Sequence, residues 1–180
     1  MRIISGIYRG VPIPSPKEEI VRPTLDRVKE NIFNILQFDV ENSTCLDLFC
    51  GSGAFGLECL SRDAKSVHFV DNNKNNISSL KTFLEKLNAK NFSLHNCDFF
   101  DALKKFSAEN MCFDIIFLDP PFDSNFAQIA IQKIFKFNLL SKDGIIVFEH
   151  EKNIKNDYSS KVFDTRVYGR IVIDFLSNKN

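Results

Sequence analysis

The chain has 180 residues, of which 44% are hydrophobic and 26% are charged, as is ordinary for a globular domain with a full core. No apolar stretch approaches membrane-spanning length, and the N-terminus turns polar too soon for a signal peptide, so we expect a cytoplasmic protein. The formal net charge of zero argues against indiscriminate nucleic-acid binding but not against a local basic patch.

The five cysteines are scattered along the chain and include no C-x-x-C pair. This pattern is typical of reduced thiols in a protein without disulfides. Cys50 lies in a glycine-rich loop with no histidine nearby in sequence, so we interpret it as a packing residue and not as a nucleophile. The three histidines are isolated, and we expect neither a metal site nor a Ser/His/Asp triad.

The N-terminal residues form a basic segment. Residues 1–22 contain several glycines and prolines, and we expect residues 3–4 and 11–13 to pair as a short hairpin. Four of the seven arginines lie within the first 27 residues: Arg2, Arg9, Arg22 and Arg27. A basic arm on a neutral body suits docking on phosphate groups, and a solvated face is the alternative.

Residues 25–38 carry apolar side chains at helical spacing after Pro23-Thr24, which predicts an amphipathic helix with Thr24 as its N-cap. Strands and helices then alternate. The predicted strands cover residues 44–49, 66–71, 92–97, 113–118 and 144–149. The predicted helices cover residues 54–61, 73–87, 100–106 and 126–137. This alternation indicates a mostly parallel sheet with helices on both faces.

The C-terminal part follows a different pattern. Residues 162–167 and 170–175 are predicted strands joined by a tight turn at Tyr168-Gly169, which makes them an antiparallel hairpin. The predicted fold is therefore α/β: a Rossmann-like, seven-stranded, mostly parallel sheet with a C-terminal antiparallel hairpin. It resembles the class I methyltransferase fold more than a dinucleotide dehydrogenase. We expect an N-terminal arm over residues 1–22 and a methyltransferase domain over residues 23–180, compact as a whole.

A glycine-rich loop follows the strand predicted at residues 44–49. Gly51, Gly53 and Gly56 match G-x-G-x-x-G, in which glycines allow the backbone to approach a ligand closely. Asp71 ends the next strand, where an acid is placed to bind a ribose hydroxyl. Because NAD and S-adenosylmethionine both carry an adenosine ribose, these features do not separate the two cofactors.

Two further acids favour S-adenosylmethionine. Asp47 lies just before the loop, where a carboxylate can hold a cationic amino-acid moiety but would repel pyrophosphate. Asp98 ends the third strand, where it can border an adenine pocket. With Asp71 and Asp119, these acids lie at the tips of four successive strands, which favours a shared crevice. Each acid alone could instead be a helix N-cap or a turn residue.

The segment Asp119-Pro120-Pro121-Phe122 follows the apolar strand at residues 113–118. Two prolines fix φ and lack N–H donors, so the backbone there is stiff and presents only carbonyls. A rigid acceptor, a carboxylate and a flat aromatic ring suit an amino group on a planar heterocycle, and a plain Pro-Pro turn is the alternative. We expect this corner and the glycine loop to open into a common cavity.

Five segments, in order along nearly the whole chain, resemble one protein family. They are residues 2–6 (RIISG), 8–10 (YRG), 22–30 (RPTLDRVKE), 46–58 (LDLFCGSGAFGLE) and 119–122 (DPPF). The family is that of the RsmD-type 16S rRNA guanine-N2 methyltransferases. The arm and the R-P-T-x-D-R-V block are its specific part, since the glycine loop and D-P-P-F occur in many amino-methyltransferases. Cys50 and Phe55 depart from the family pattern but leave the glycines intact.

The resemblance implies methyl transfer from S-adenosylmethionine to the N2 amine of a guanine in 16S ribosomal RNA, in an assembled or assembling small subunit. The product would be S-adenosylhomocysteine, and we expect a monomer that uses no metal. The implied catalytic residues are Asp119, Pro120, Pro121 and Phe122. The implied cofactor-binding residues are Asp47, Phe49, Gly51, Ser52, Gly53, Gly56, Asp71, Asn72, Asp98 and Phe99. Contacts to RNA phosphates are expected from Arg2, Arg9, Arg22 and Arg27.

Four alternatives stay open. Arg27 could instead form an ion pair with Asp26 near the helix start. An adenine-N6 or other amino-methyltransferase is the nearest alternative enzyme, since D-P-P-[FY] serves several amines. A nicotinamide-dependent oxidoreductase would share the glycine loop, but the chain lacks a credible set of hydride-transfer residues. A catalytically silent RNA-binding assembly factor would keep the fold, although the intact D-P-P-F segment argues against it.

Overall fold

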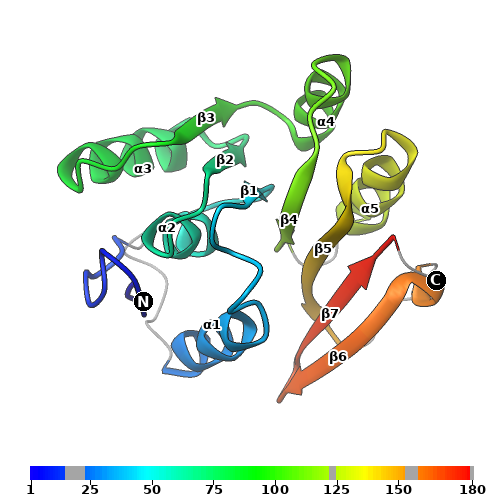
Figure 1. Cartoon of the computed structure of the whole chain (residues 1–180), viewed down its shortest axis with the longest axis horizontal. Coiled ribbons are helices and arrows are strands. Elements are labelled where there is room, and N and C mark those ends of the chain that lie inside the picture. The colour runs from blue at the N-terminus through cyan, green and yellow to red at the C-terminus, as the bar shows by residue number, and fades with distance from the viewer. Residues whose placement is uncertain (15–22, 122–124, 153–157, 179–180) are drawn as a thin grey trace.

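A seven-stranded sheet forms the centre of the structure (Figure 1). The computed structural model describes residues 1–14, 23–121, 125–152 and 158–178. The strands are β1 (Thr44–Asp47), β2 (Ser66–Asp71), β3 (Phe92–Asn96), β4 (Phe113–Leu118), β5 (Leu140–Glu151), β6 (Val162–Tyr168) and β7 (Ile171–Ser177). Their order is β3-β2-β1-β4-β5-β7-β6. The first five strands pair in parallel, whereas β7 is antiparallel to β5 and β6. This confirms the predicted fold class.

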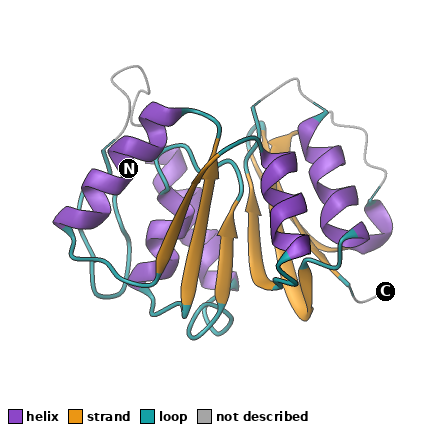
Figure 2. Ribbon diagram, turned by 90° about the horizontal axis from the view of Figure 1, so that it is seen from above, coloured by secondary structure: helices purple, strands orange, loops and turns teal. Residues whose placement is uncertain are grey.

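Helices cover both faces of the sheet (Figure 2). They are α1 (Pro23–Ile35), α2 (Ala54–Ser61), α3 (Lys74–Lys86), α4 (Phe99–Ala108) and α5 (Phe126–Lys136). Cys45 of β1 lies in the core that α1, α2 and α3 share, and Leu46 lies in the core beneath α4 and α5. This alternation follows from the two-residue period of a strand. Within the described ranges, no helix combines the length and apolar character needed to cross a membrane.

Most predicted boundaries differ from the structure by a few residues, and the start of α1, the start of β5 and the hairpin turn are the informative cases. The helix α1 begins at Pro23, so Thr24 lies in its first turn and is not the residue before it; proline suits the first turn because its missing N–H would be unpaired there. The strand β5 begins at Leu140, ahead of Gly144. The hairpin turn is Gly169-Arg170, because Tyr168 still pairs with Ile171.

The N-terminal arm, residues 1–14, packs against α1 and α2. An antiparallel bridge joins Arg2 to Pro12, and the N–H of Ile3 donates to the carbonyl of Val11 at 3.0 Å. Residues 3–4 and 11–13 therefore pair as predicted, over a short length. The side chains of Ile3 and Ile13 are buried in the core that contains α1 and α2.

A fully buried carboxylate, that of Glu58 on α2, holds the arm in place. Its oxygens accept hydrogen bonds from the backbone N–H groups of Ile4 at 2.8 Å and Ser5 at 3.0 Å. Lys29 on α1 and Arg62 beyond α2 complete the cluster, with N–O distances of 3.2 Å and 2.9 Å. A buried charge is tolerated when it is paired and hydrogen-bonded, so this cluster joins the arm, α1 and α2.

The close approach of the arm to α2 depends on Gly6. This residue has a φ of 79°, and a Cβ atom there would lie 1.6 Å from the carbonyl oxygen of Ser61. Gly10 has a similar φ of 84°, but a Cβ atom there would meet nothing within 4 Å. A side chain would therefore introduce backbone strain at either glycine, but only a side chain at position 6 would also clash with α2.

We expect Gly6→Ala to detach the arm and to lower the free energy of unfolding more than Gly10→Ala does, because only the first variant combines strain with overlap. Hydrogen–deuterium exchange of residues 1–14, together with thermal unfolding, measures the difference. Equal exchange in the two variants would contradict the close contact.

A buried histidine–aspartate pair connects β5 to β7. His150 Nε2 lies 3.0 Å from Asp174 Oδ2, and Thr165 donates to the other Asp174 oxygen at 2.6 Å. Burial lowers the pKa of His150, but its bonds to Asp174 and to the Glu151 carbonyl outweigh burial and raise that pKa overall. Burial raises the pKa of Asp174, but the bonds from His150 and Thr165 outweigh burial and lower that pKa overall.

The pair should stabilise the fold most between about pH 4 and about pH 6.5. The His150 contribution is present below its unfolded pKa and is lost as pH rises through its raised folded value. The Asp174 contribution is present above its unfolded pKa and is lost as pH falls through its lowered value. Asp174→Asn should therefore reduce the free energy of unfolding more at pH 5.5 than at pH 8, as chemical denaturation at both pH values would measure. A loss that does not change with pH would contradict this linkage.

Candidate active site

The site lies where the order of the strands reverses. The chain moves outward from β1 through β2 to β3 and then returns to β4 on the other side of β1. Ligands of open α/β sheets bind at the carboxyl ends of the strands beside such a reversal. The glycine loop leaves this end of β1, and Asp119 follows the same end of β4.

The glycine loop is held by the neighbouring strand. The N–H of Cys50 donates to the carbonyl of Val70 at 2.9 Å, and the N–H of Gly51 donates to Asp71 Oδ2 at 2.8 Å. The Cys50 side chain is buried, and burial raises the pKa of its thiol, so it packs in the loop as expected and is unsuited to act as a nucleophile. The loop and the tip of β2 thus form one wall.

Asp71 organises that wall. Its carboxylate accepts from Gly51, from the backbone N–H of Asn73 at 2.7 Å and from the side chain of Asn76 at 3.1 Å. Two carboxylate oxygens offer about four acceptor positions, so three donors leave room for one further hydroxyl. The sequence did not single out Asn73 or Asn76, and the only signal was their place in the first turns after β2.

A cavity of about 390 Å³, here named the Asp71 cavity, lies against this wall. The glycine loop contributes Phe49 and Gly51, and Asn72 follows Asp71 at the tip of β2. The opposite wall consists of the corner after β4. The residues that the cavity shares with the predicted site are Phe49, Gly51, Asp71, Asn72, Asp98, Phe99, Asp119, Pro120 and Pro121. The structure therefore brings the proline corner and the glycine loop into a common cavity.

Aromatic rings line one end of the Asp71 cavity. The ring of Phe99 lies 5.2 Å from that of Phe49 and 5.3 Å from that of Phe126, measured between centroids. Asp98 caps α4 beneath Phe99 by accepting from the N–H of Phe100 at 2.8 Å. Such rings suit a flat heterocycle, and the half-exposed Phe126, which the sequence did not single out, extends this surface.

A second cavity of about 240 Å³, here named the Glu149 cavity, adjoins the first. Phe49, Gly51 and Asp119 line both cavities, and Ser52 lines the second. Asp47 also lines it and is buried, and one of its oxygens accepts from the N–H of Gly56 at 3.0 Å. Burial raises the pKa of Asp47 to about 7, against the lowering effect of that bond.

Gly53 and Gly56 line neither of these cavities. A Cβ atom on Gly53 would lie 2.7 Å from the side chain of Leu80, and one on Gly56 would lie 2.2 Å from the ring of Phe69. These two glycines therefore allow α2 to pack tightly against the sheet and α3. They thus contribute to the site indirectly, because this packing positions the glycine loop and the start of α2.

Glu149 is an acidic residue of the site that the sequence did not single out. Leu118 of β4 pairs with Phe148 of the parallel strand β5. Asp119 and Glu149 are the next residues in the chain after this pair, so they lie at the same edge of the sheet. Both line the Glu149 cavity. Burial and then the charge of Asp119 raise the pKa of Glu149 to about 8. The sequence did carry one signal for Glu149: like the four aspartates, it is an acid at the end of a predicted strand.

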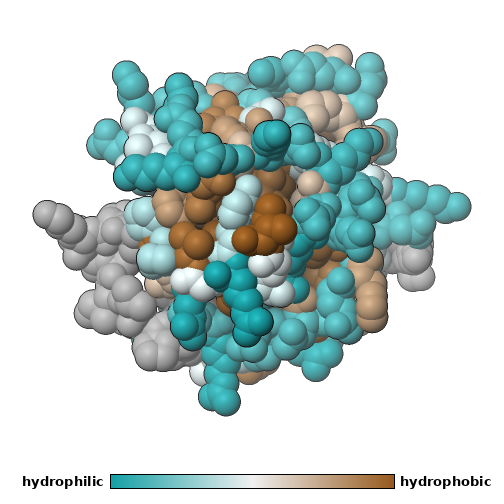
Figure 3. Space-filling model, turned by 60° about the vertical axis from the view of Figure 1, so that its left-hand side comes forward, coloured by the Kyte–Doolittle hydropathy of each residue, from teal (hydrophilic) through white to brown (hydrophobic). Residues whose placement is uncertain are grey.

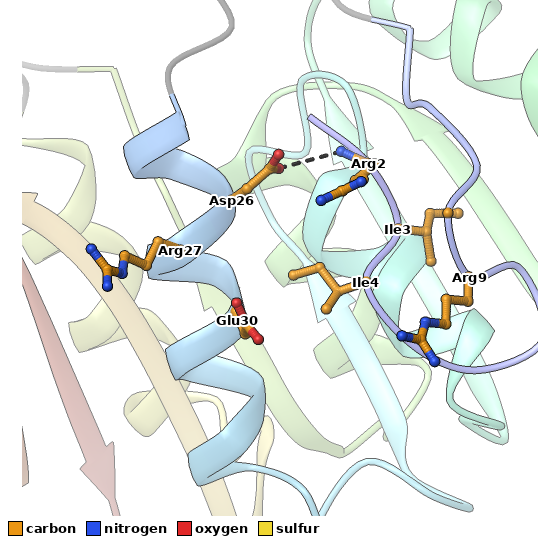
Figure 4. Close-up of a pocket in the computed structure, with 8 residues that line it drawn as sticks. Arg2, Ile3, Ile4, Arg9, Asp26, Arg27 and Glu30 are labelled. Carbon is orange, nitrogen blue, oxygen red and sulfur yellow. Dashed lines mark hydrogen bonds between the residues drawn. The ribbon is translucent and has the colours of Figure 1, made fainter.

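The arginines surround a different cavity, of about 630 Å³, between the arm and α1 (Figure 4). Arg2, Arg9 and Arg27 line it together with Asp26 and Glu30. Figure 4 shows Arg27 extending away from the other two arginines. Among the described residues no ion pair joins Asp26 to Arg27; Asp26 instead accepts from the backbone N–H of Arg2 at 3.3 Å.

Two predicted site residues, Arg22 and Phe122, lie outside the described residues. The side of the molecule that carries the arm has a largely hydrophilic surface around a smaller hydrophobic area (Figure 3). On the described part of the arm, Arg2 and Arg9 are exposed. The structure thus separates an acidic pair of cavities at the strand tips from a cavity beside the arm that carries both charges.

Comparison with known proteins places this arrangement in a family. The family model described as Conserved hypothetical protein 95 matches residues 1–177. A Haemophilus influenzae protein named ribosomal RNA small subunit methyltransferase D is 41% identical over 155 residues, covering 85% of this chain and 80% of that protein. The Escherichia coli protein of the same name is 34% identical over 151 residues, covering 84% and 75%.

A solved structure from Haemophilus influenzae agrees with this assignment. It matches with a TM-score of 0.83 at 34% sequence identity, over 99% of this chain and 98% of that one. The chain therefore belongs to the Conserved hypothetical protein 95 family, together with the relatives named ribosomal RNA small subunit methyltransferase D.

Proposed function

We propose that the protein transfers a methyl group from S-adenosylmethionine to the exocyclic N2 amine of a guanine in small-subunit ribosomal RNA. The observation that carries this proposal is the Asp71 cavity, in which a glycine loop and the Asp119-Pro120-Pro121 corner face a common space. The relatives at 41% and 34% identity, whose names specify methyl transfer and small-subunit ribosomal RNA, support the same function.

The residues of the two cavities fit the cofactor. S-adenosylmethionine supplies a methyl group on a cationic sulfonium. The carboxylate of Asp71 has acceptor capacity left for a ribose hydroxyl, and Phe99 and Phe126 offer apolar ring surface for an adenine. The acids Asp47 and Asp119 favour a cationic group beside the glycine loop.

The corner after β4 would hold the target amine. A guanine N2 amine is a poor nucleophile because its lone pair is delocalised into the ring. The Asp119 carboxylate and the Pro120 carbonyl would accept its two N–H groups and so orient the lone pair toward the methyl group. The Asp119 carboxylate would also stabilise the positive charge that develops on nitrogen. Phe122 would stack on the base, a contact typically worth about 1–3 kcal/mol.

The arm would hold the RNA around an extruded guanine. A paired and stacked amine cannot reach the corner after β4, so the base must be presented outside its stack. Arg2 and Arg9 are exposed on the arm and line the same cavity, which suits contact with phosphates. Arg22 and Arg27 complete the proposed set. We further propose that the enzyme is a monomer and that it acts on the assembled or assembling small subunit.

Asp119→Ala should lower the rate of methyl transfer by at least about 100-fold, because the variant loses the group that orients the amine and stabilises its charge. Affinity for S-adenosylhomocysteine should stay within about threefold. Transfer of labelled methyl groups to small subunits from cells that lack this gene measures the rate, and mass spectrometry of the RNA identifies the product. Asp39→Ala, an exposed acid after α1, is the control. Near-normal transfer by Asp119→Ala would exclude the proposed role.

Arg9→Gln should weaken binding to unmodified small subunits and should reduce the slope of log affinity against log salt by about one unit, because one phosphate contact is lost. Arg166→Gln is the matched control, since Arg166 lies on the edge strand β6 and is paired there with Asp164 at 2.8 Å. Filter binding at several salt concentrations measures both. Identical slopes for the two variants would rule out Arg9 as an RNA contact.

A further inference from the structure

The Glu149 cavity contains more acid than orientation of an amine requires. Asp47, Asp119 and Glu149 reach it from the carboxyl ends of three adjacent strands, β1, β4 and β5. Asp119 is assigned above to the target amine, and Asp47 is bonded to the start of α2. Glu149 has neither task, although it is half-buried at the same sheet edge, one residue beyond the pairing of Leu118 with Phe148.

Charged groups reach this cavity from the strands, from α1 and from the arm, whereas α2 contributes only Ala54 and Phe55. The strands contribute the three acids, α1 contributes Lys29, and the arm contributes Met1. Lys29 is already paired with Glu58 and donates to the carbonyl of Arg2 at 2.7 Å. Glu149 pairs across the sheet with the apolar Ile173 of β7. Of the described groups that line this cavity, Asp47 and Asp119 are acids like Glu149, and the Lys29 ammonium is bound elsewhere.

The proposed reaction produces a proton that must leave the nitrogen of the amine. The nitrogen lone pair forms the new N–C bond while the C–S bond breaks and its electron pair stays on sulfur. Positive charge develops on the nitrogen, which starts the step with both of its hydrogens. One N–H bond breaks in the same step, with its electron pair returning to nitrogen and its proton passing to a base, so loss of that base slows methyl transfer itself.

We propose that the carboxylate of Glu149 is the base that takes this proton from the amine as the methyl group is transferred, and then passes it to solvent. The inference rests on the proposed function and assigns a separate residue to proton removal. Asp119 holds the amine, and Glu149 lies beside Asp119 on the side of the next strand. The pair thus divides orientation and proton removal between two acids at one sheet edge.

The electrostatics of the cavity match this task. A pKa of about 8 for Glu149 lies close to neutrality, where a general base is most effective. A cationic sulfonium in the cavity favours the ionised carboxylate before transfer. As the methyl group moves, the positive charge leaves the sulfur, so the proton affinity of Glu149 rises in the step in which the proton leaves the nitrogen.

The test compares Glu149→Gln and Glu149→Asp with Glu151→Gln, an exposed acid two residues further along β5. Single-turnover methyl transfer to unmodified small subunits is measured with saturating S-adenosylmethionine from about pH 6 to about pH 9, together with S-adenosylhomocysteine affinity. The wild-type rate should rise with pH as Glu149 ionises. Glu149→Gln should lose this rise and about 100-fold in rate at pH 8. Glu149→Asp should keep the rise at a reduced rate, and Glu151→Gln should behave as wild type.

A Glu149→Gln protein that binds S-adenosylhomocysteine normally and transfers within twofold of the wild-type rate would overturn the inference. A wild-type rate that stays constant over this pH range would also overturn it, and this result does not depend on any variant folding. Both outcomes leave the proposed function intact. Failure of the wild-type protein to methylate the subunits would instead contradict the proposed function itself.

Discussion

The buried carboxylate of Glu58 is the interaction on which the arrangement of the sites depends. It accepts two backbone N–H groups of the arm and is paired with Lys29 and Arg62. Loss of one partner from a buried ion pair typically costs about 3–5 kcal/mol, because an unpaired charge is left behind. The cluster therefore fixes the arm against α1 and α2. That position creates the cavity lined by the arginines and places Met1 and Lys29 at the Glu149 cavity.

A second constraint is the topology of the parallel sheet, which brings the ends of β1, β4 and β5 to one edge. Asp47, Asp119 and Glu149 are thereby crowded into a partly buried space, and the pKa values of Asp47 and Glu149 rise to about 7 and about 8. Such crowding of acids is unfavourable by itself, and a cationic ligand would relieve it. The same arrangement would thus favour a sulfonium cofactor and, in the proposed mechanism, supply a proton acceptor as the methyl group moves.

The two sites differ in the way that they treat charge. At the strand tips Asp47, Asp119 and Glu149 gather in one cavity, which suits a cationic cofactor and an amine that becomes charged. Beside the arm, Arg2 and Arg9 are exposed, while Asp26 and Glu30 share the cavity. A surface of mixed sign on a chain with no net charge suits selective contact with a shaped RNA more than indiscriminate binding to nucleic acid. The proposed function needs both sites at once.

The sequence by itself determined the alternating strands and helices, the C-terminal hairpin and the meeting of the glycine loop with the Asp119 corner. Those features depend on local periodicity and on the rule that parallel strands end at one edge. Only the tertiary structure decided that Glu149 and Phe126 line the cavities and that Glu58 binds the arm. Their partners lie far away in the chain, as with Glu58 and Ile4, and no local pattern records which distant groups meet. Burial and pairing also set the charge state of an acid, so a pKa near 8 for Glu149 follows from its neighbours and not from its place in the sequence.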